Sequence, residues 1–206
     1  MSFKVNGLVV RVMNYINLIK YIEDENIALN NNYYYYAFNY RQKDFINMIT
    51  DGIKSPILLR KNSEGNNGNF YVSLSKKERC EYSIYDKLNN NPMFVINNNI
   101  KTIQTRNFIK NGHYPLCFIN SPLPFRESEY DNEYQVFLKV PSRNILAIEY
   151  NLFNNCRLNN NDYFREQLII LKQMIIDLNS KNIHIPIIDA STSNKINKEK
   201  VLLLKM

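Results

Sequence analysis

The sequence lacks tryptophan and has only five glycines, three cysteines and two histidines. So few glycines argue against a collagen-like or elastic chain. Cys80, Cys117 and Cys156 lie far apart and form no CxxC pair, so the sequence shows neither a disulfide framework nor the ligand spacing of a zinc site. We therefore expect a reducing compartment and no bound metal.

Several common catalytic motifs are also missing. The chain has no Walker A loop, no GxGxxG, no HExxH and no GxSxG. A Ser-His-Asp triad would have to use His113 or His184, and a structural or surface role suits each of them better. No run approaches the roughly 18 apolar residues of a membrane span, and the N-terminal MSFKVNGLVV lacks the pattern of a secretory signal. We expect a soluble protein with no membrane partner.

What the sequence does contain fits one domain. Its 206 residues are 45% hydrophobic, which is enough for a buried core. The net charge of +7 is dispersed, which is typical of a solvated surface, and a groove for nucleic acid is the alternative. Asparagine accounts for about 34 residues, well above its ordinary share. Because asparagine tolerates turns, its clusters predict loops at 30–32, 66–69, 89–91, 97–99 and 159–161.

Hydrophobic periodicity predicts the elements between these loops. Helical spacing favours helices over 9–28, 42–50 with Gly52 as a stop signal, 76–88 and 163–179. Apolar and aromatic runs favour strands over 33–40, 70–74, 92–96, 114–119, 133–140, 144–150 and 183–188. This pattern is typical of an α+β protein with a split, mostly antiparallel β-sheet core and flanking helices. We expect a single domain over 1–206, with an N-terminal helical segment at 1–30 and a C-terminal helix and added strand at 160–206.

Three segments, read in order, carry most of the functional information. The first, YYAFNYRQKDFINMITDGIKS at 35–55, is an aromatic strand, a turn, an amphipathic helix and a Gly-Ile-x-Ser exit. The second, GNFYVSLSKK at 68–77, is a strand that places Ser73 and Ser75 on the same side. The third, YDNEYQVFLKVPSRNILAI at 130–148, has an acidic residue at the start of a strand, then a proline turn and a second strand.

This order resembles the ADP-ribosyltransferase superfamily, whose members use NAD as a substrate. Tyr-x-Asn-Glu-Tyr-x-Val is similar to the stretch around the catalytic glutamate of poly(ADP-ribose) polymerases, with Asp131 as one extra residue. The middle segment resembles the family's aromatic-hydrophobic-Ser-x-Ser strand, and the first resembles the opening of DarT-like and polymerase-like members. The resemblance covers residues 33–150 and implies an ADP-ribosyltransferase-like fold. Members of the DarT-like and polymerase-like branches usually have an NAD-binding histidine in the first strand, and this sequence has none there. Either the chain is more similar to the toxin-like branch, in which an arginine takes part of that role, or its activity is altered.

Glu133 is the candidate catalytic residue. Cleavage of the glycosidic bond of NAD passes through an oxocarbenium-like state, and a carboxylate near the ribose can bind its hydroxyl and stabilise the developing positive charge. The alternative is an ordinary exposed glutamate at the end of a strand.

The resemblance implies the rest of the site. Ser75 is the best candidate to orient Glu133, with Ser73 beside it. The backbone of Tyr36, Ala37 and Phe38 would hold the carboxamide of NAD, and Tyr82 or Tyr85 could stack on nicotinamide. The diphosphate needs a cation, for which Arg41 and Arg60 are the candidates because arginine binds phosphate with a bidentate fork. In the loop 121–132, Asp131 and Phe125 would help to select the acceptor.

The expected function is NAD-dependent mono-ADP-ribosylation of a macromolecule, either protein or nucleic acid. The resemblance implies a toxin or effector that is cytoplasmic or delivered into a host cell. One alternative is an NAD glycohydrolase on the same fold. The other is a non-catalytic nucleic-acid-binding or interaction protein, which the +7 charge and the abundant tyrosines would suit.

Overall fold

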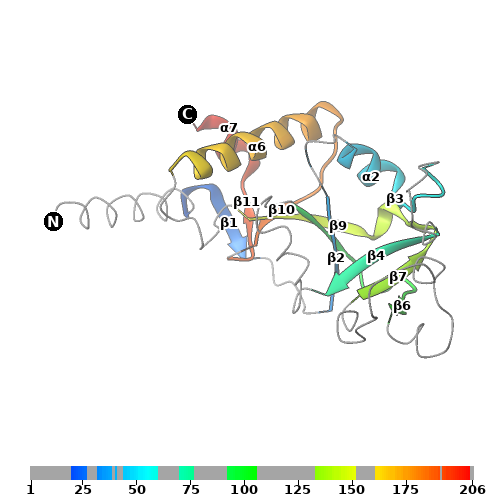
Figure 1. Ribbon diagram of the computed structural model, residues 1–206. Coiled ribbons are helices and arrows are strands. Elements are labelled where there is room, and N and C mark those ends of the chain that lie inside the picture. Colours follow the sequence, from blue (N-terminus) through cyan, green and yellow to red (C-terminus); the bar gives the residue numbers. More distant parts are fainter. Residues whose placement is uncertain are drawn as a thin grey trace. The chain divides into compact units, whose positions relative to one another are not determined.

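The computed structural model shows a mixed α and β protein with a mostly antiparallel sheet and a few helices (Figure 1). It describes residues 20–26, 32–38, 40, 44–59, 70–76, 92–105, 133–151, 161–190 and 192–204, with the backbone alone at 161–164. The expected α+β class is confirmed at this level. The chain divides into two compact units, each made of separate stretches of sequence. The first unit comprises 1–29, 90–92 and 147–206, and the second comprises 30–89 and 93–146.

The second unit contains antiparallel strands in the order β5-β2-β4-β7-β6. Their bounds are Met93–Ile96 for β5, Tyr34–Ala37 for β2, Tyr71–Lys76 for β4, Glu133–Phe137 for β7 and Ile103–Gln104 for β6. The strands expected at 33–40, 70–74 and 92–96 are therefore confirmed. The central pair β4 and β7 lie side by side in Figure 1.

Alternation along these strands separates an apolar face from a polar one. Val72, Leu74 and Val136 are buried at 4%, 1% and 4% exposure, whereas Ser73 between the first two is exposed. In register, Ser75 pairs with Glu133 and Ser73 with Gln135. We call the surface that carries Ser73, Ser75, Glu133 and Gln135 the polar face. The apolar face contributes to the core, where Phe38 stacks between Phe94 and Phe45 with ring centroids 4.1 and 5.9 Å away.

A short helix and a two-stranded sheet complete the described part of the second unit. Helix α2 spans Phe45–Asp51 and is followed by β3 (Ile53–Lys54), which pairs with β8 (Lys139–Val140). The expected helix over 42–50 is thus confirmed, and so is its stop at Gly52. Gly52 has φ 87°, and a Cβ there would lie 2.3 Å from the carbonyl oxygen of Val140.

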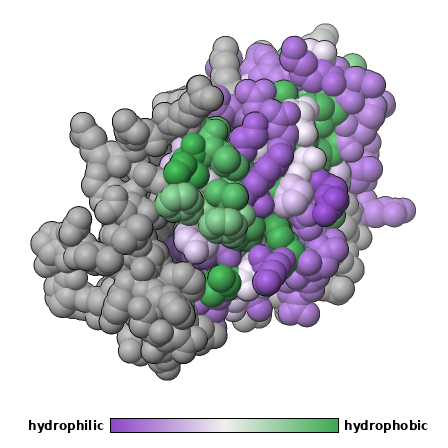
Figure 2. All heavy atoms as spheres, turned by 90° about the vertical axis from the view of Figure 1, so that its right-hand side faces the viewer, coloured by the Kyte–Doolittle hydropathy of each residue, from purple (hydrophilic) through white to green (hydrophobic). Residues whose placement is uncertain are grey.

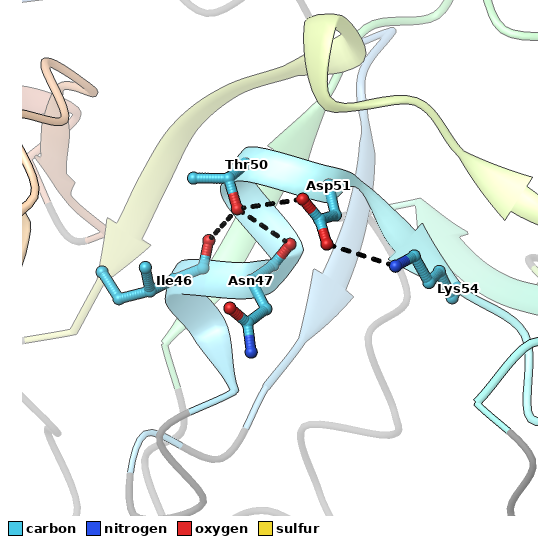
Figure 3. Close-up of polar contacts among 5 residues, drawn as sticks. All are labelled: Ile46, Asn47, Thr50, Asp51 and Lys54. Atoms are coloured by element: carbon cyan, nitrogen blue, oxygen red, sulfur yellow. Dashed lines mark hydrogen bonds and ion pairs between the residues drawn. The ribbon is translucent and has the colours of Figure 1, made fainter.

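The end of helix α2 is held by exposed polar contacts, shown in Figure 3. The Thr50 hydroxyl donates to the carbonyl of Ile46 at 3.2 Å, and Lys54 Nζ lies 3.2 Å from Asp51 Oδ2. The strand expected at 133–140 is interrupted at Leu138, whose φ of 60° separates β7 from β8. The carbonyl of Leu138 accepts from the Ser55 amide at 2.8 Å, which ties this break to the segment after β3.

The first unit contains the strand order β1-β11-β10-β9, with β10 and β9 parallel and the other pairs antiparallel. The bounds are Glu23–Asn26 for β1, Asn194–Ile196 for β11, Ile187–Asp189 for β10 and Ile145–Tyr150 for β9, which begins in the second unit. A 3₁₀ turn over Ser142–Asn144 precedes β9. The strand expected at 144–150 is confirmed, and the one expected at 183–188 begins later and ends one residue beyond.

Two helices follow in the first unit and lie beside each other in Figure 1. Helix α6 spans Asn161–Ser180, as the periodicity predicts, and buries its apolar residues, which include Leu171, Met174, Ile175 and Leu178. Helix α7 spans Lys198–Leu203, and the Asn197 side chain caps it by accepting from the Lys200 amide at 3.0 Å.

The N-terminal prediction is wrong in one part. A single helix was expected over 9–28, but only residues 20–22 of its described part are helical, and 23–26 form β1. The antiparallel pairing of β1 with β11, far away in sequence, outweighs the local helical spacing. The helix expected at 76–88 and the strand expected at 114–119 lie outside the described residues, apart from Lys76, which ends β4.

Candidate functional site

Glu133 is the first residue of β7, and its side chain lies on the polar face of the second unit. Two donors converge on one of its carboxylate oxygens. The Ser73 hydroxyl donates to Oε1 over 2.8 Å, and Gln135 Nε2 donates to the same oxygen over 2.8 Å. Strand β4 thus meets β7 through side chains as well as through the backbone ladder.

Gln135 connects Glu133 to a third segment. Its Nε2 lies 2.9 Å from Ser73 Oγ and 3.3 Å from Thr105 Oγ1, which follows strand β6. Gln135 is 9% exposed and Thr105 is fully buried. An amide nitrogen has two hydrogens, so Gln135 shares them among three acceptors. We call Ser73, Thr105, Glu133 and Gln135 the Glu133 network.

The second carboxylate oxygen of Glu133 differs from the first. Oε2 is buried and has no hydrogen-bond partner among the residues that the structure describes. Burial raises the pKa of the Glu133 carboxyl above its usual 4.5, while hydrogen bonds from Ser73, Gln135 and Thr105 act to lower it. A buried acceptor without a donor costs free energy, so a ligand hydroxyl that reached Oε2 would be bound favourably.

The structure brings some of the expected site residues together. Ser75 lies opposite Glu133 in the register of β4 and β7, but the hydroxyl placed 2.8 Å from the carboxylate belongs to Ser73, which was expected only as its neighbour. Ala37 is exposed at the end of β2, and Phe38 just beyond it is buried in the core. Burial raises the pKa of the Tyr36 hydroxyl. The expected cation, stacking and acceptor residues lie outside the described part of the chain: Arg41, Arg60, Tyr82, Tyr85, Phe125 and Asp131.

Sequence reasoning missed Gln135 and Thr105. The signal for Gln135 was present, because a residue two positions after Glu133 in a strand shares its face. A polar residue there, opposite Ser73, could have been added to the candidate site. Thr105 had no comparable signal, because its approach depends on the pairing of β6 with β7.

A second group of polar side chains, built around the buried Glu23 and Asp189, lies in the first unit. Thr192 Oγ1 lies 2.8 Å from Glu23 Oε1 and 2.9 Å from Asp189 Oδ2, and Asn194 Nδ2 donates to Glu23 Oε2 over 2.8 Å. Glu23 is 8% exposed, and burial together with nearby Asp189 raises the pKa of its carboxyl. Because both oxygens of Glu23 have donors, this cluster joins β1 to the segment between β10 and β11.

Exposed apolar side chains also occur in the second unit. Ile57, Leu58 and Leu59 follow β3 and are 41%, 45% and 44% exposed, and Phe137 at the end of β7 is 59% exposed. Figure 2 shows apolar side chains gathered in one area, with hydrophilic ones along its right-hand side. Phe137 contacts the Tyr71 ring, with centroids 5.6 Å apart, so an apolar surface adjoins the polar face.

Comparisons with protein-family models, with curated proteins and with solved structures find no match for this chain. Among the helices that the structure describes, none combines the length and the apolar character needed to cross a membrane. Within the same residues, no group of three or more histidine, cysteine, aspartate or glutamate side chains could hold a metal ion.

Proposed function

We propose that this chain is an NAD-dependent mono-ADP-ribosyltransferase in which Glu133 is the catalytic carboxylate. The observation that carries the proposal is the state of that carboxylate, with Oε1 bound by Ser73 and Gln135 and with Oε2 buried without a described partner. An oxygen of this kind can accept a hydrogen bond from a hydroxyl of the nicotinamide ribose. The negative charge then stabilises the positive charge that develops on the sugar.

The arrangement of strands supports the same proposal. Tyr35 of β2 pairs with Ser75 of β4, and Ser75 pairs with Glu133 of β7. The three segments that resemble the ADP-ribosyltransferases therefore contribute neighbouring strands of one sheet. In the proposed reaction, the bond between nicotinamide and ribose breaks, nicotinamide leaves, and a nucleophile of the acceptor bonds to the same ribose carbon and loses its proton.

The raised pKa of Glu133 is compatible with this role. The carboxyl must be ionised to stabilise a cation, and donation from Ser73 and Gln135 favours the ionised form against the effect of burial. Activity is therefore expected to rise with pH as Glu133 loses its proton.

Labelled NAD tests the proposal. The purified protein is incubated with NAD labelled in the adenosine part, together with mixed cell proteins or nucleic acid, and transfer to macromolecules is measured. We expect transfer by the native chain and its loss in Glu133→Gln, which keeps the size of the side chain but not its charge. Transfer that survives in Glu133→Gln would exclude Glu133 as the catalytic residue.

Release of nicotinamide, followed in parallel, separates the two enzymatic alternatives. Nicotinamide release without labelled macromolecules indicates an NAD glycohydrolase that uses the same carboxylate with water as the acceptor. If the native chain neither binds NAD by calorimetry nor releases nicotinamide, the enzymatic proposal fails. Salt-dependent binding to nucleic acid would then favour the non-catalytic alternative.

A further inference from the structure

We propose that Gln135 is a positioning residue that fixes the Glu133 carboxylate with Oε2 directed to the substrate. This inference rests on the proposed function for its catalytic meaning, but the contacts behind it do not. Gln135 donates to Glu133 Oε1 over 2.8 Å and comes from the same strand, two residues later. Neither the motif resemblance nor the charge pattern identifies Gln135 as a site residue.

The need for such a residue follows from the geometry of a glutamate at a strand end. Its carboxylate can rotate about the last side-chain bond, and a single donor would leave the plane of the carboxylate loosely defined. Here Ser73 and Gln135 both donate to Oε1, each over 2.8 Å, from two different strands. The two oxygens are chemically equivalent, so what these donors fix is the plane of the carboxylate, and turning that plane away would lengthen both hydrogen bonds unless the donors moved as well.

Gln135 is itself held in place, which makes it suited to this task. Its side chain is 9% exposed, its Nε2 also lies 3.3 Å from Thr105 Oγ1, and its Oε1 is 3.2 Å from Ser73 Oγ. Supporting contacts of this kind limit the movement of a functional group more effectively than exposed ones. The glutamine therefore links the carboxylate to both neighbouring segments, through Ser73 of β4 and Thr105 after β6.

Gln135 should also act on the protonation of Glu133. Among the residues that the structure describes, the side chains that lower the pKa of Glu133 are those of Ser73, Gln135 and Thr105, and all three are uncharged. An amide donor favours the ionised carboxylate. Its removal should raise the pKa of Glu133 and move the acid limb of the activity profile to higher pH.

The central variant is Gln135→Met, which keeps the length of the side chain and removes the donor. The control is Gln167→Met, because Gln167 is also a buried glutamine, and its Oε1 accepts from the Tyr150 hydroxyl over 2.8 Å in the first unit. The titration of Glu133 is followed by carbon NMR of labelled carboxyl groups, with Glu133→Gln used to assign the signal. Nicotinamide release from NAD is measured across the same pH range.

We expect Gln135→Met to raise the pKa of Glu133 by about one unit, the size expected for one lost hydrogen bond to a charged group. The acid limb of the activity profile should move by the same amount. Gln167→Met should leave both unchanged. An unchanged Glu133 titration in folded Gln135→Met would overturn the inference, as would an activity loss that is equal at every pH.

Gln135→Asn provides a second route if Gln135→Met does not fold. It keeps the amide but shortens the side chain by one methylene, which draws the amide nitrogen away from Glu133 Oε1, so the Glu133 titration should shift in the same direction, and no shift would count against the inference. The two proposals fail in different ways. If the Gln135 variants shift the Glu133 titration but the native chain never consumes NAD, the enzymatic proposal fails and the positioning role of Gln135 stands. If the native chain consumes NAD and the variants leave both turnover and the Glu133 titration unchanged, the enzymatic proposal stands and the positioning role fails.

Discussion

Glu23 in the first unit is buried and Glu133 in the second is half-buried, and burial raises the pKa of each carboxyl. They differ in how their oxygens are used. Glu23 accepts on both, from Thr192 and from Asn194, each over 2.8 Å. Glu133 accepts two hydrogen bonds on Oε1, and its Oε2 has no partner among the described residues.

The difference separates a structural carboxylate from a candidate functional one. The partners of Glu23 lie 169 and 171 positions away in the sequence, so its hydrogen bonds attach the early strand β1 to the end of the chain. Each of its two oxygens has a donor within the fold. Glu133 keeps an acceptor for a ligand, although leaving a buried acceptor without a donor destabilises the folded state. Burial and a raised pKa alone would not distinguish the two.

The strongest test of this comparison makes the same substitution at both positions. Glu133→Met should reduce NAD turnover at least 100-fold, the scale of losing one transition-state charge interaction. Its stability should fall less than that of Glu23→Met, because the buried Oε2 without a described partner is removed together with the acceptor of Ser73 and Gln135. Glu23→Met should retain turnover, but its free energy of unfolding should fall by about 1–3 kcal/mol because Asn194 Nδ2 loses its acceptor and Thr192 is left with Asp189 as its acceptor. Turnover and urea denaturation are measured on both variants. Equal effects at the two positions would remove the distinction between them.

A second prediction concerns how the strand of Glu133 is supported. Gly52→Ala should destabilise the second unit by about 3 kcal/mol, because φ is 87° and the new Cβ would meet the Val140 carbonyl at 2.3 Å. The matching change in the first unit is Ser193→Gly, at a φ of 60°, which should be nearly neutral. Thermal unfolding compares the two. A tolerated Gly52→Ala would show that the β3 and β8 pair adjusts at small cost.

A third prediction compares the two serines of β4. Ser73→Ala should lower turnover about tenfold and move its acid limb to higher pH, because it removes a hydrogen bond to a charged group. Ser75→Ala should have a smaller effect, because the hydroxyl 2.8 Å from the carboxylate belongs to Ser73. The measurement is nicotinamide release at several pH values. A larger loss in Ser75→Ala would favour Ser75 over Ser73 as the residue that orients Glu133.

The sequence could predict the strands and the polar face because local alternation encodes them. Val72 and Leu74 alternate with Ser73 and Ser75, and the structure confirms this pattern. The same alternation places both serines on one side, so it could not decide which hydroxyl reaches Glu133. That choice depends on side-chain geometry across the pair of strands.

Long-range pairing accounts for the other failures. The helical spacing of the N-terminal segment ends at Ile22, and the helix expected as far as residue 28 gives way to β1 at 23–26, because Asn194–Ile196 offer a partner strand. The acceptor role of Glu23 also arises only in that pairing. Thr105 likewise enters the Glu133 network through the pairing of β6 with β7. None of these contacts can be derived from neighbours in the sequence, since each joins segments about 30 to 170 residues apart.

The smallest expected effect is the pH dependence of stability in the first unit. The pKa of Glu23 is raised in the folded state above its usual 4.5, so the folded chain binds a proton more tightly than the unfolded chain. The stabilising contribution of this proton is fully present below pH 4.5 and is lost as pH rises through the folded pKa. In Glu23→Gln, which cannot titrate, this contribution is absent, so the stability difference between native and variant should change as pH rises above about 4.5. Urea midpoints at each pH measure that difference. A difference that moves in favour of the native chain as pH rises would mean that the hydrogen bonds from Thr192 and Asn194 outweigh burial and the neighbouring Asp189.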